Sequence, residues 1–140
     1  MTADAASLRH FILDGTKVSS LATFAEEFSR VVLPDYTWNG NLDAFNDILR
    51  GGFGTPEEGF VLVWRGSNTS RENLGYEQTV RELEVRLARC HPSNRVDVEQ
   101  HIRRAKRREG PTVFDWLVEI IADHGPGGEQ SADNVFLELE

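Results

Sequence analysis

The stretch that decides the fold is residues 33–49, LPDYTWNGNLDAFNDIL. Its second half predicts a short amphipathic helix. Asn41 is a favourable N-cap, because its side-chain oxygen can accept a hydrogen bond from a free backbone N–H in the first turn. An apolar stripe follows at three- and four-residue spacing and indicates a face that packs on a core, formed by Leu42, Phe45, Ile48 and Leu49. The helix should end at Gly51 and Gly52, since glycine readily takes the left-handed conformation after a helix.

Two acidic residues, Asp43 and Asp47, lie four positions apart and project from the exposed face of this helix, with Asn46 beside them. Like charges at this spacing destabilise a helix by roughly 0.2–0.5 kcal/mol, although Asp43 is favoured near the positive end of the helix dipole. Local stability therefore does not explain the pair, whereas a cationic partner would. The alternative is that both carboxylates simply solvate a helix surface.

The loop before the helix carries two aromatic residues, Tyr36 and Trp38. Exposed rings beside carboxylates provide rigid contact area next to charge, a composition that is enriched among the residues that anchor protein interfaces. Trp38 fits equally well as a lid over the core. Both interpretations stay open from the sequence.

Further elements surround this region. Before it, residues 11–13 and the Asp14-Gly15 turn predict a short buried strand. Ser19 or Ser20 can then cap a helix that ends before Pro34. The apolar stripe of that helix is formed by Leu21, Phe24, Phe28 and Val31. After the central stretch, residues 60–64 form a nearly continuous apolar run, which is typical of a strand covered on both faces in a parallel sheet.

The second half of the chain is mainly helical. Residues 72–90 predict one helix that His91-Pro92 ends. A polar helix at about 96–109 and an apolar one beginning near Phe114 follow, and residues 134–139 form a last strand. Helical crossovers between successive strands predict an α/β fold with a three-stranded parallel sheet and surrounding helices. We expect a single domain over residues 1–140, with an extra basic helical insertion at about 72–110.

Composition limits the class of protein. Cys90 is the only cysteine, so an internal disulfide and a thiolate metal cluster are excluded, and a reducing compartment is expected. The N-terminus lacks the basic start and apolar run of a signal peptide, and no apolar run reaches the roughly 18 residues of a membrane helix. We therefore expect a cytoplasmic protein without a membrane segment, and we expect no cofactor and no metal.

Charge is unevenly distributed along the chain. Residues 1–70 carry nine acids and five bases, residues 71–110 seven acids and ten bases, and residues 111–140 seven acids and no base. The three segments have net charges of −4, +3 and −7, which give −8 in total. An acidic protein is repelled by nucleic acid and attracted to basic partners.

With these elements in order, the chain resembles the barstar family of intracellular ribonuclease inhibitors. The shared motifs are the opening strand with Asp14-Gly15, Leu33-Pro34-Asp35-Tyr36, Asn41-Leu42-Asp43-Ala44 with Asp47 and Leu49, Leu62-Val63-Trp64-Arg65, and an apolar C-terminal strand. The resemblance covers about residues 10–70 and 112–139. It implies a barstar-like fold and a protein that is not an enzyme. Such a protein would act as an immunity protein or antitoxin that binds a small basic, extracellular-type ribonuclease similar to barnase.

The resemblance also implies a partner-binding site. Its expected members are Tyr36, Trp38, Asn41, Asp43, Asn46, Asp47 and Gly51. Asp43 and Asp47 would enter the cationic active site of the ribonuclease. One extra residue precedes the Asn41 motif, so either Tyr36 or Trp38 fills the family's aromatic position. Asn46 replaces the family's tryptophan between the two acids, which indicates a different ribonuclease target or a different register of contact.

Two other functions are weighed against inhibition. Paired carboxylates and the histidines at positions 10, 91, 101 and 124 could transfer protons. No phosphate-binding loop, metal-ligand spacing or nucleophile motif accompanies them, so catalysis is disfavoured. The run RRAKRR at residues 103–108 could contact RNA phosphates, but no aromatic residue interleaves it and acidic segments flank it. Alternatively, residues 72–110 could mediate self-association.

Overall fold

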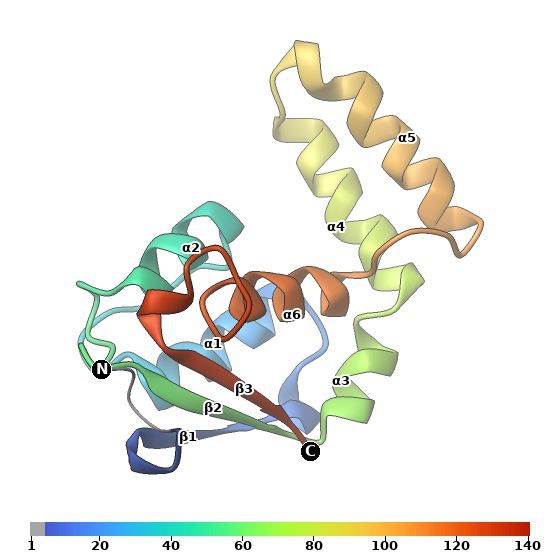
Figure 1. Cartoon of the computed structure of the whole chain (residues 1–140). Coiled ribbons are helices and arrows are strands. Elements are labelled where there is room, and N and C mark those ends of the chain that lie inside the picture. The colour runs from blue at the N-terminus through green and yellow to red at the C-terminus, as the bar shows by residue number, and fades with distance from the viewer. Residues whose placement is uncertain (1–4) are drawn as a thin grey trace.

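The computed structural model describes residues 5–140, which contain one parallel sheet of three strands. The strands are β1 (Arg9–Asp14), β2 (Phe60–Arg65) and β3 (Val135–Leu139), in the spatial order β1-β2-β3 (Figure 1). In register, Val61 of β2 lies opposite His10 of β1 and Phe136 of β3. The predicted α/β fold with a three-stranded parallel sheet is therefore confirmed.

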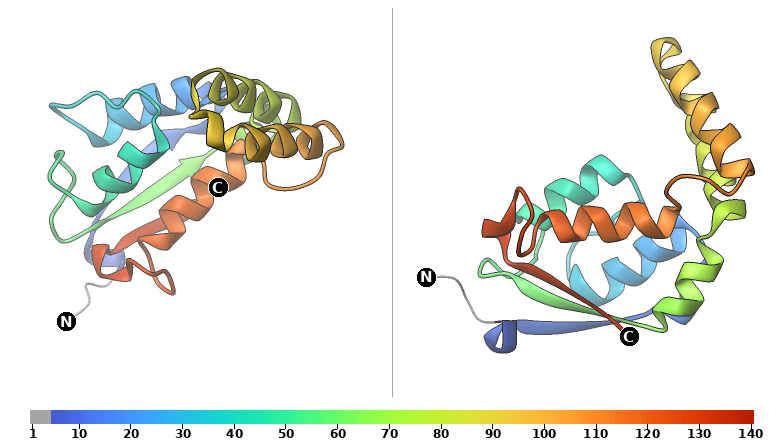
Figure 2. Two further views of the ribbon diagram at one scale, coloured as in Figure 1. Left: turned by 90° about the horizontal axis from the view of Figure 1, so that it is seen from above. Right: turned by 45° about the vertical axis from the view of Figure 1, so that its right-hand side comes forward.

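Three helices lie over one face of the sheet, namely α1 (Leu21–Val32), α2 (Leu42–Arg50) and α6 (Val113–Asp123) (Figure 1, Figure 2). Ser20 caps α1 in a capping box, because its side chain accepts from the N–H of Thr23 while the Thr23 side chain accepts from the backbone of Ser20. The apolar faces of the helices meet the sheet in one core. Its largest side chains include Phe24, Phe28, Trp38, Phe45, Trp64 and Phe114.

The central strand β2 is buried on both faces, as its apolar run predicts. Phe60, Leu62 and Trp64 point into the helix-covered core. Val61 and Val63 point to the opposite face, where Leu8 packs against them and leaves them 0% and 5% exposed.

The chain between β2 and α6 forms three helices, α3 (Ser67–Asn73), α4 (Tyr76–Arg89) and α5 (Arg95–Lys106). The single helix predicted at 72–90 is wrong, since α3 ends before Leu74 and α4 starts after Gly75. Leu74 is fully buried in the main core, so the chain must turn there before α4 can leave the sheet. α4 and α5 then lie side by side as a hairpin that projects away from the sheet (Figure 1, Figure 2).

The hairpin formed by α4 and α5 has a small core of its own. Its buried members are Leu83, Val98, Ile102 and Ala105. Trp116 of α6 packs against this cluster, and the guanidinium of Arg86 lies 5.1 Å from the centre of the Trp116 ring. The hydroxyl of Tyr76 donates to the carbonyl of Gly110 at 2.8 Å and closes the base of the hairpin.

Short 3₁₀ helices complete the fold at Ala5–Ser7 (η1), Gly15–Lys17 (η2), Pro92–Asn94 (η3) and Ser131–Asp133 (η4). No helix among the described residues combines the length and the apolar character needed to cross a membrane.

Candidate partner-binding site

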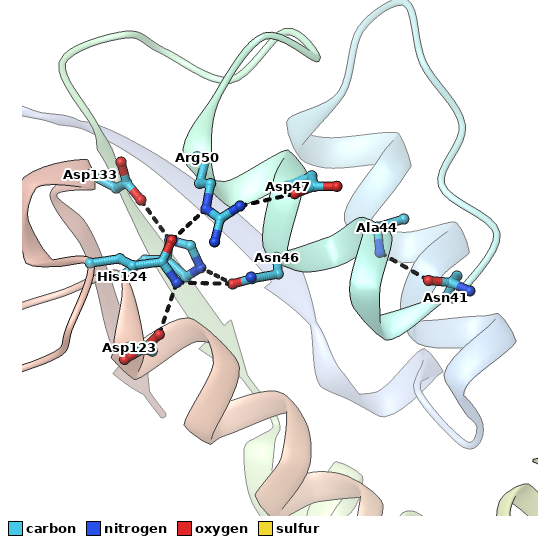
Figure 3. A network of polar contacts seen from close by, with 9 residues as sticks. Asn41, Ala44, Asn46, Asp47, Arg50, Asp123, His124 and Asp133 are labelled. Atoms are coloured by element: carbon cyan, nitrogen blue, oxygen red, sulfur yellow. Dashed lines mark hydrogen bonds and ion pairs between the residues drawn. The ribbon is translucent and has the colours of Figure 1, made fainter. Parts of the chain in front are cut away.

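Helix α2 is anchored by the features that its sequence predicts. Asn41 is its N-cap, with the side-chain oxygen accepting from the N–H of Ala44 at 2.9 Å (Figure 3). The apolar stripe is buried in the main core, and Phe45 and Ile48 are fully enclosed. Gly51 ends the helix with φ of 113°, a conformation that L side chains rarely adopt. Space within 4 Å of a Cβ built on Gly51 is empty, so the backbone of this turn is open to a partner.

The two acids of α2 are exposed, but their surroundings differ. The carboxylate of Asp43 makes no hydrogen bond or ion pair with any of residues 5–140. Asp47 accepts from a terminal guanidinium nitrogen of Arg50 at 3.2 Å, and the two side chains are 61% and 53% exposed. An exposed pair of this kind contributes about 0.2–1 kcal/mol. The predicted like-charge repulsion is therefore only part of the local balance, because Arg50 compensates one of the two charges.

Trp38 is part of the core and is not a surface anchor. Its side chain is 1% exposed and stacks on Phe45, with ring centres 4.4 Å apart and planes inclined by 13°. The indole Nε1 donates to the carbonyl of Asn41 at 2.8 Å, and the backbone N–H donates to Oγ of Ser29 at 2.9 Å. Of the two interpretations of Trp38, the lid over the core is the one that the structure shows. Direct contact of this ring with a partner is not compatible with its burial.

Tyr36 is the exposed aromatic residue of this loop. It is 39% accessible, and its ring centre lies 5.0 Å from that of Phe53, which follows α2. The loop before α2 and the turn after it thus meet through two aromatic rings. Of the two residues weighed for the aromatic contact position, only Tyr36 presents its ring on the surface.

Asn46 lies beside the two acids on α2, but it is half-buried whereas they are exposed. Its side chain turns toward His124, whose Nε2 lies 2.6 Å from Oδ1 of Asn46 (Figure 3). His124 is completely buried, and its Nδ1 lies 2.7 Å from Oδ2 of Asp133. The other three histidines, at positions 10, 91 and 101, are exposed. The side-chain oxygen of Asn46 is therefore engaged in hydrogen bonds within the molecule.

The segment between α6 and β3 supplies this side of the site, and none of its residues is among the candidates predicted from the sequence. Gln130 receives a hydrogen bond from Nε of Arg50 and donates to Asn46 at 3.3 Å. It also donates to Asp123 at 3.0 Å, and the N–H of Glu129 donates to the same carboxylate. These hydrogen bonds, led by that of Gln130, hold the pKa of Asp123 below its ordinary value. The carboxylate therefore stays ionised and keeps Gln130 oriented.

A groove of about 200 Å³ opens beside the end of α2. It is lined by Arg50 from α2 and Gly51 from the turn after it, by Pro56 and Glu57 from the loop before β2, and by Asp133 from η4. Within residues 5–140 no group of three or more histidine, cysteine, aspartate or glutamate residues could hold a metal ion. The surface thus presents two carboxylates on a fixed helix, with an open turn beside them.

The sequence model of a protein family described as Barstar (barnase inhibitor) matches residues 8–90. The match includes β1, α1, α2 and β2 and continues through α4, so it contains the acidic helix and the loop before it. The match covers residues 10–70, the first of the two stretches that resemble the family, and continues to residue 90. The second stretch, residues 112–139, lies outside the match. No curated protein matches the chain.

Proposed function

Since the chain belongs to the barstar family, with residues 8–90 of 140 in the match, we propose that it is an intracellular inhibitor of a small basic ribonuclease of the barnase type. The family is one of barnase inhibitors and not of enzymes. In this proposal α2 and the loop before it cover the active site of the ribonuclease and exclude its substrate.

Two carboxylates on a firmly anchored helix carry this proposal. A ribonuclease must hold the phosphates of its substrate with arginine, lysine or histidine, so its active site is cationic. Asp43 and Asp47 present negative charge from one helix whose apolar face is fixed in the core. A fixed charge array loses little conformational freedom on binding, which favours a tight complex. Opposite net charges of the two proteins also accelerate their association.

We assign different roles to the candidate residues. Asp43 and Asp47 would enter the cationic site, and Tyr36 would supply the aromatic contact. Asn41 lies exposed at the start of the helix and Gly51 in the open turn after it, so both would border the interface. The two remaining candidates, Trp38 and Asn46, would act from inside the protein by holding α2.

Inhibition of purified barnase and of related small basic ribonucleases tests the proposal. We expect RNA cleavage to fall in proportion to added protein until one molecule is present per enzyme. The double variant Asp43→Ala, Asp47→Ala should lose this inhibition while keeping its circular dichroism spectrum. The control is Glu77→Ala, Glu84→Ala, which removes the same charge from exposed positions of α4.

Equal inhibition by the two double variants would show that α2 is not the binding surface. Failure of the native protein to inhibit any of the ribonucleases at micromolar concentration would overturn the proposed function itself.

A further inference from the structure

A series of hydrogen bonds joins α2 to the segment between α6 and β3, and its donors and acceptors can be assigned from one end (Figure 3). Arg50 is the starting point because a guanidinium can only donate. Its Nε donates to Oε1 of Gln130, so the other amide atom of Gln130 is the NH₂ donor. This nitrogen donates to Oδ2 of Asp123 at 3.0 Å and to Oδ1 of Asn46 at 3.3 Å. The orientation of Gln130 thus identifies Oδ1 as the atom of Asn46 that faces the network.

His124 lies on the other side of Asn46. Its Nε2 is 2.6 Å from the same Oδ1 of Asn46, and its Nδ1 is 2.7 Å from Oδ2 of Asp133. An amide oxygen and an ionised carboxylate are both acceptors, so each ring nitrogen must carry a proton to make its hydrogen bond. A neutral imidazole has only one such proton. The geometry is therefore that of a positively charged imidazolium.

The charges around the ring agree with this assignment. Those that surround the network are Asp133 from η4, Asp123 from the end of α6, and the Arg50–Asp47 pair from α2. Without a proton on His124 these groups comprise three negative charges and one positive charge. A completely buried charge is stable in a protein only when it is paired and hydrogen bonded. Asp133 and Asn46 meet both requirements for His124.

We propose that His124 is a positioning residue for the binding helix, and that it holds α2 in place only while both of its ring nitrogens are protonated. The consequence for inhibition rests on the ribonuclease-binding function proposed above. The protonation of the ring and its effect on α2 are properties of the free protein.

Loss of a proton from His124 would break the network at a defined place. An unprotonated Nε2 would face Oδ1 of Asn46, acceptor against acceptor. Rotation of the Asn46 amide would repair this contact only by turning its NH₂ group toward that of Gln130. In either arrangement α2 loses a hydrogen bond to the α6–β3 segment.

The direction of the pH dependence follows from linkage. We call α2 docked when its hydrogen bond to His124 is formed. At a pH where a free histidine is neutral, the protein with α2 docked binds one more proton than the protein with α2 undocked. Docking is therefore favoured by protonation of the ring and weakens when the ring loses its proton. One linked proton changes the docking equilibrium by at most about tenfold per pH unit.

Nuclear magnetic resonance of the full chain tests this without a ribonuclease. Spectra of the imidazole nitrogens and of the α2 backbone amides would be recorded between about pH 5 and pH 9, which spans the ordinary histidine range. We expect both ring nitrogens of His124 to carry a proton whenever α2 shows its native amide signals. We also expect the amide signals of α2 to move together with the ring when it titrates. A single ring proton on His124 in a protein with native α2 signals would overturn the proposal.

Two variants and a matched control extend the test. His124→Gln retains a polar side chain of similar reach but cannot donate in both directions, so the titration of the α2 signals should disappear. Asp133→Asn removes the carboxylate while keeping its shape, and should weaken the coupling between the ring and the α2 signals. Asp133→Asn also keeps the test decisive if His124→Gln does not fold. The control is His101→Gln, which replaces an exposed histidine of α5 and should change neither signal.

The pH dependence of barnase inhibition completes the experiment. The ratio of the inhibition constant of the native protein to that of His124→Gln should rise with pH, by up to about tenfold per pH unit. The corresponding ratio for His101→Gln should stay constant, which cancels the titration of the enzyme's own groups. A flat ratio for His124→Gln, with inhibition intact, would overturn the positioning role alone. Coupled titration of the ring and α2 without any inhibition would overturn the ribonuclease-binding function and leave the positioning role standing.

Discussion

Arg50 and Asp47 are neighbours on α2, yet replacing them should change ribonuclease binding in opposite directions. Asp47→Asn removes a charge that would face a cation of the enzyme. Arg50→Met removes a charge that repels that cation and also competes with it for Asp47, since the two side chains lie 3.2 Å apart. We therefore expect Asp47→Asn to weaken the complex and Arg50→Met to strengthen it.

The size of each effect follows from the distances. A cation at about 4 Å from Asp47 is attracted by roughly 1 kcal/mol in water and roughly 4 kcal/mol at the effective dielectric of a protein surface. Asp47→Asn should thus weaken binding by about fivefold to about a thousandfold. With Arg50 3.2 Å beyond Asp47, the same cation would lie at about 7 Å from the guanidinium and be repelled by about 0.6 to 2.4 kcal/mol. Arg50→Met should then strengthen binding by about threefold to about fiftyfold.

Association and dissociation rates with barnase, measured by surface plasmon resonance at several salt concentrations, provide the assay. Both effects should shrink as salt is raised, because exposed charges are screened. Gln130→Ala is the control for Arg50→Met, since it removes the same hydrogen bond to the α6–β3 segment and keeps the charge. If Arg50→Met weakens the complex at low salt as much as Asp47→Asn does, and Gln130→Ala does not, the acids of α2 do not face a cationic site.

Three further predictions concern the fold and the rival function. Trp38→Ala should lower the free energy of unfolding by about 3–5 kcal/mol in urea titrations, because a fully buried ring is lost; a change below about 1 kcal/mol would contradict its place in the core. The hydrogen bond from Arg30 is the main reason why the pKa of Glu27 lies below its ordinary value. The ionised Glu27 carboxylate therefore stabilises the fold above the ordinary glutamate pKa, and this stabilisation is lost as pH falls through the lower pKa of Glu27 in the folded protein. Glu27→Gln should accordingly flatten the decline of stability between about pH 5 and pH 2, and parallel declines in the two proteins would contradict this. In gel-shift experiments at physiological salt we expect no RNA binding from the basic end of α5, because the whole chain carries a net charge of −8; a salt-sensitive shift that is lost in Arg103→Ser, Lys106→Ser would favour the rival function.

The position of α2 could be predicted from the sequence because every signal for it is local. The N-cap Asn41, the apolar stripe and the two glycines after the helix lie within twelve residues of each other. Each acts on backbone or side chains one or two turns away. The same holds for β2, whose continuous apolar run is typical of a strand covered on both faces.

The orientation of single side chains in and beside α2 could not be predicted in this way. Trp38 lies in an irregular loop, where no periodicity tells which way a ring points. Asn46 is turned inward by His124, which lies 78 residues away in the chain. The break between α3 and α4 was missed for a similar reason, because burial of Leu74 in the main core decides where the chain turns.

The contribution of the α6–β3 segment had a topological signal. In a parallel sheet all strands start at the same edge. α2 leads into the start of β2, and the segment with His124, Gln130 and Asp133 leads into the start of β3. Polar residues in that segment must therefore lie close to the end of α2. Charged and amide side chains before one strand are thus candidates for contact with a helix that precedes the neighbouring strand.

The affinity of this protein for a ribonuclease should depend on residues that the ribonuclease does not touch. A helix of nine residues is not stable on its own in water, so its placement is supplied by its anchors. Trp38 fixes the start of α2 through the carbonyl of Asn41, and His124 fixes its second half through Asn46. Asp43 lies next to the first anchor and Asp47 next to the second. Loosening either anchor would let one acid move relative to the other. The two carboxylates would then have to be ordered when the ribonuclease binds, and the entropy cost of that ordering would weaken the complex.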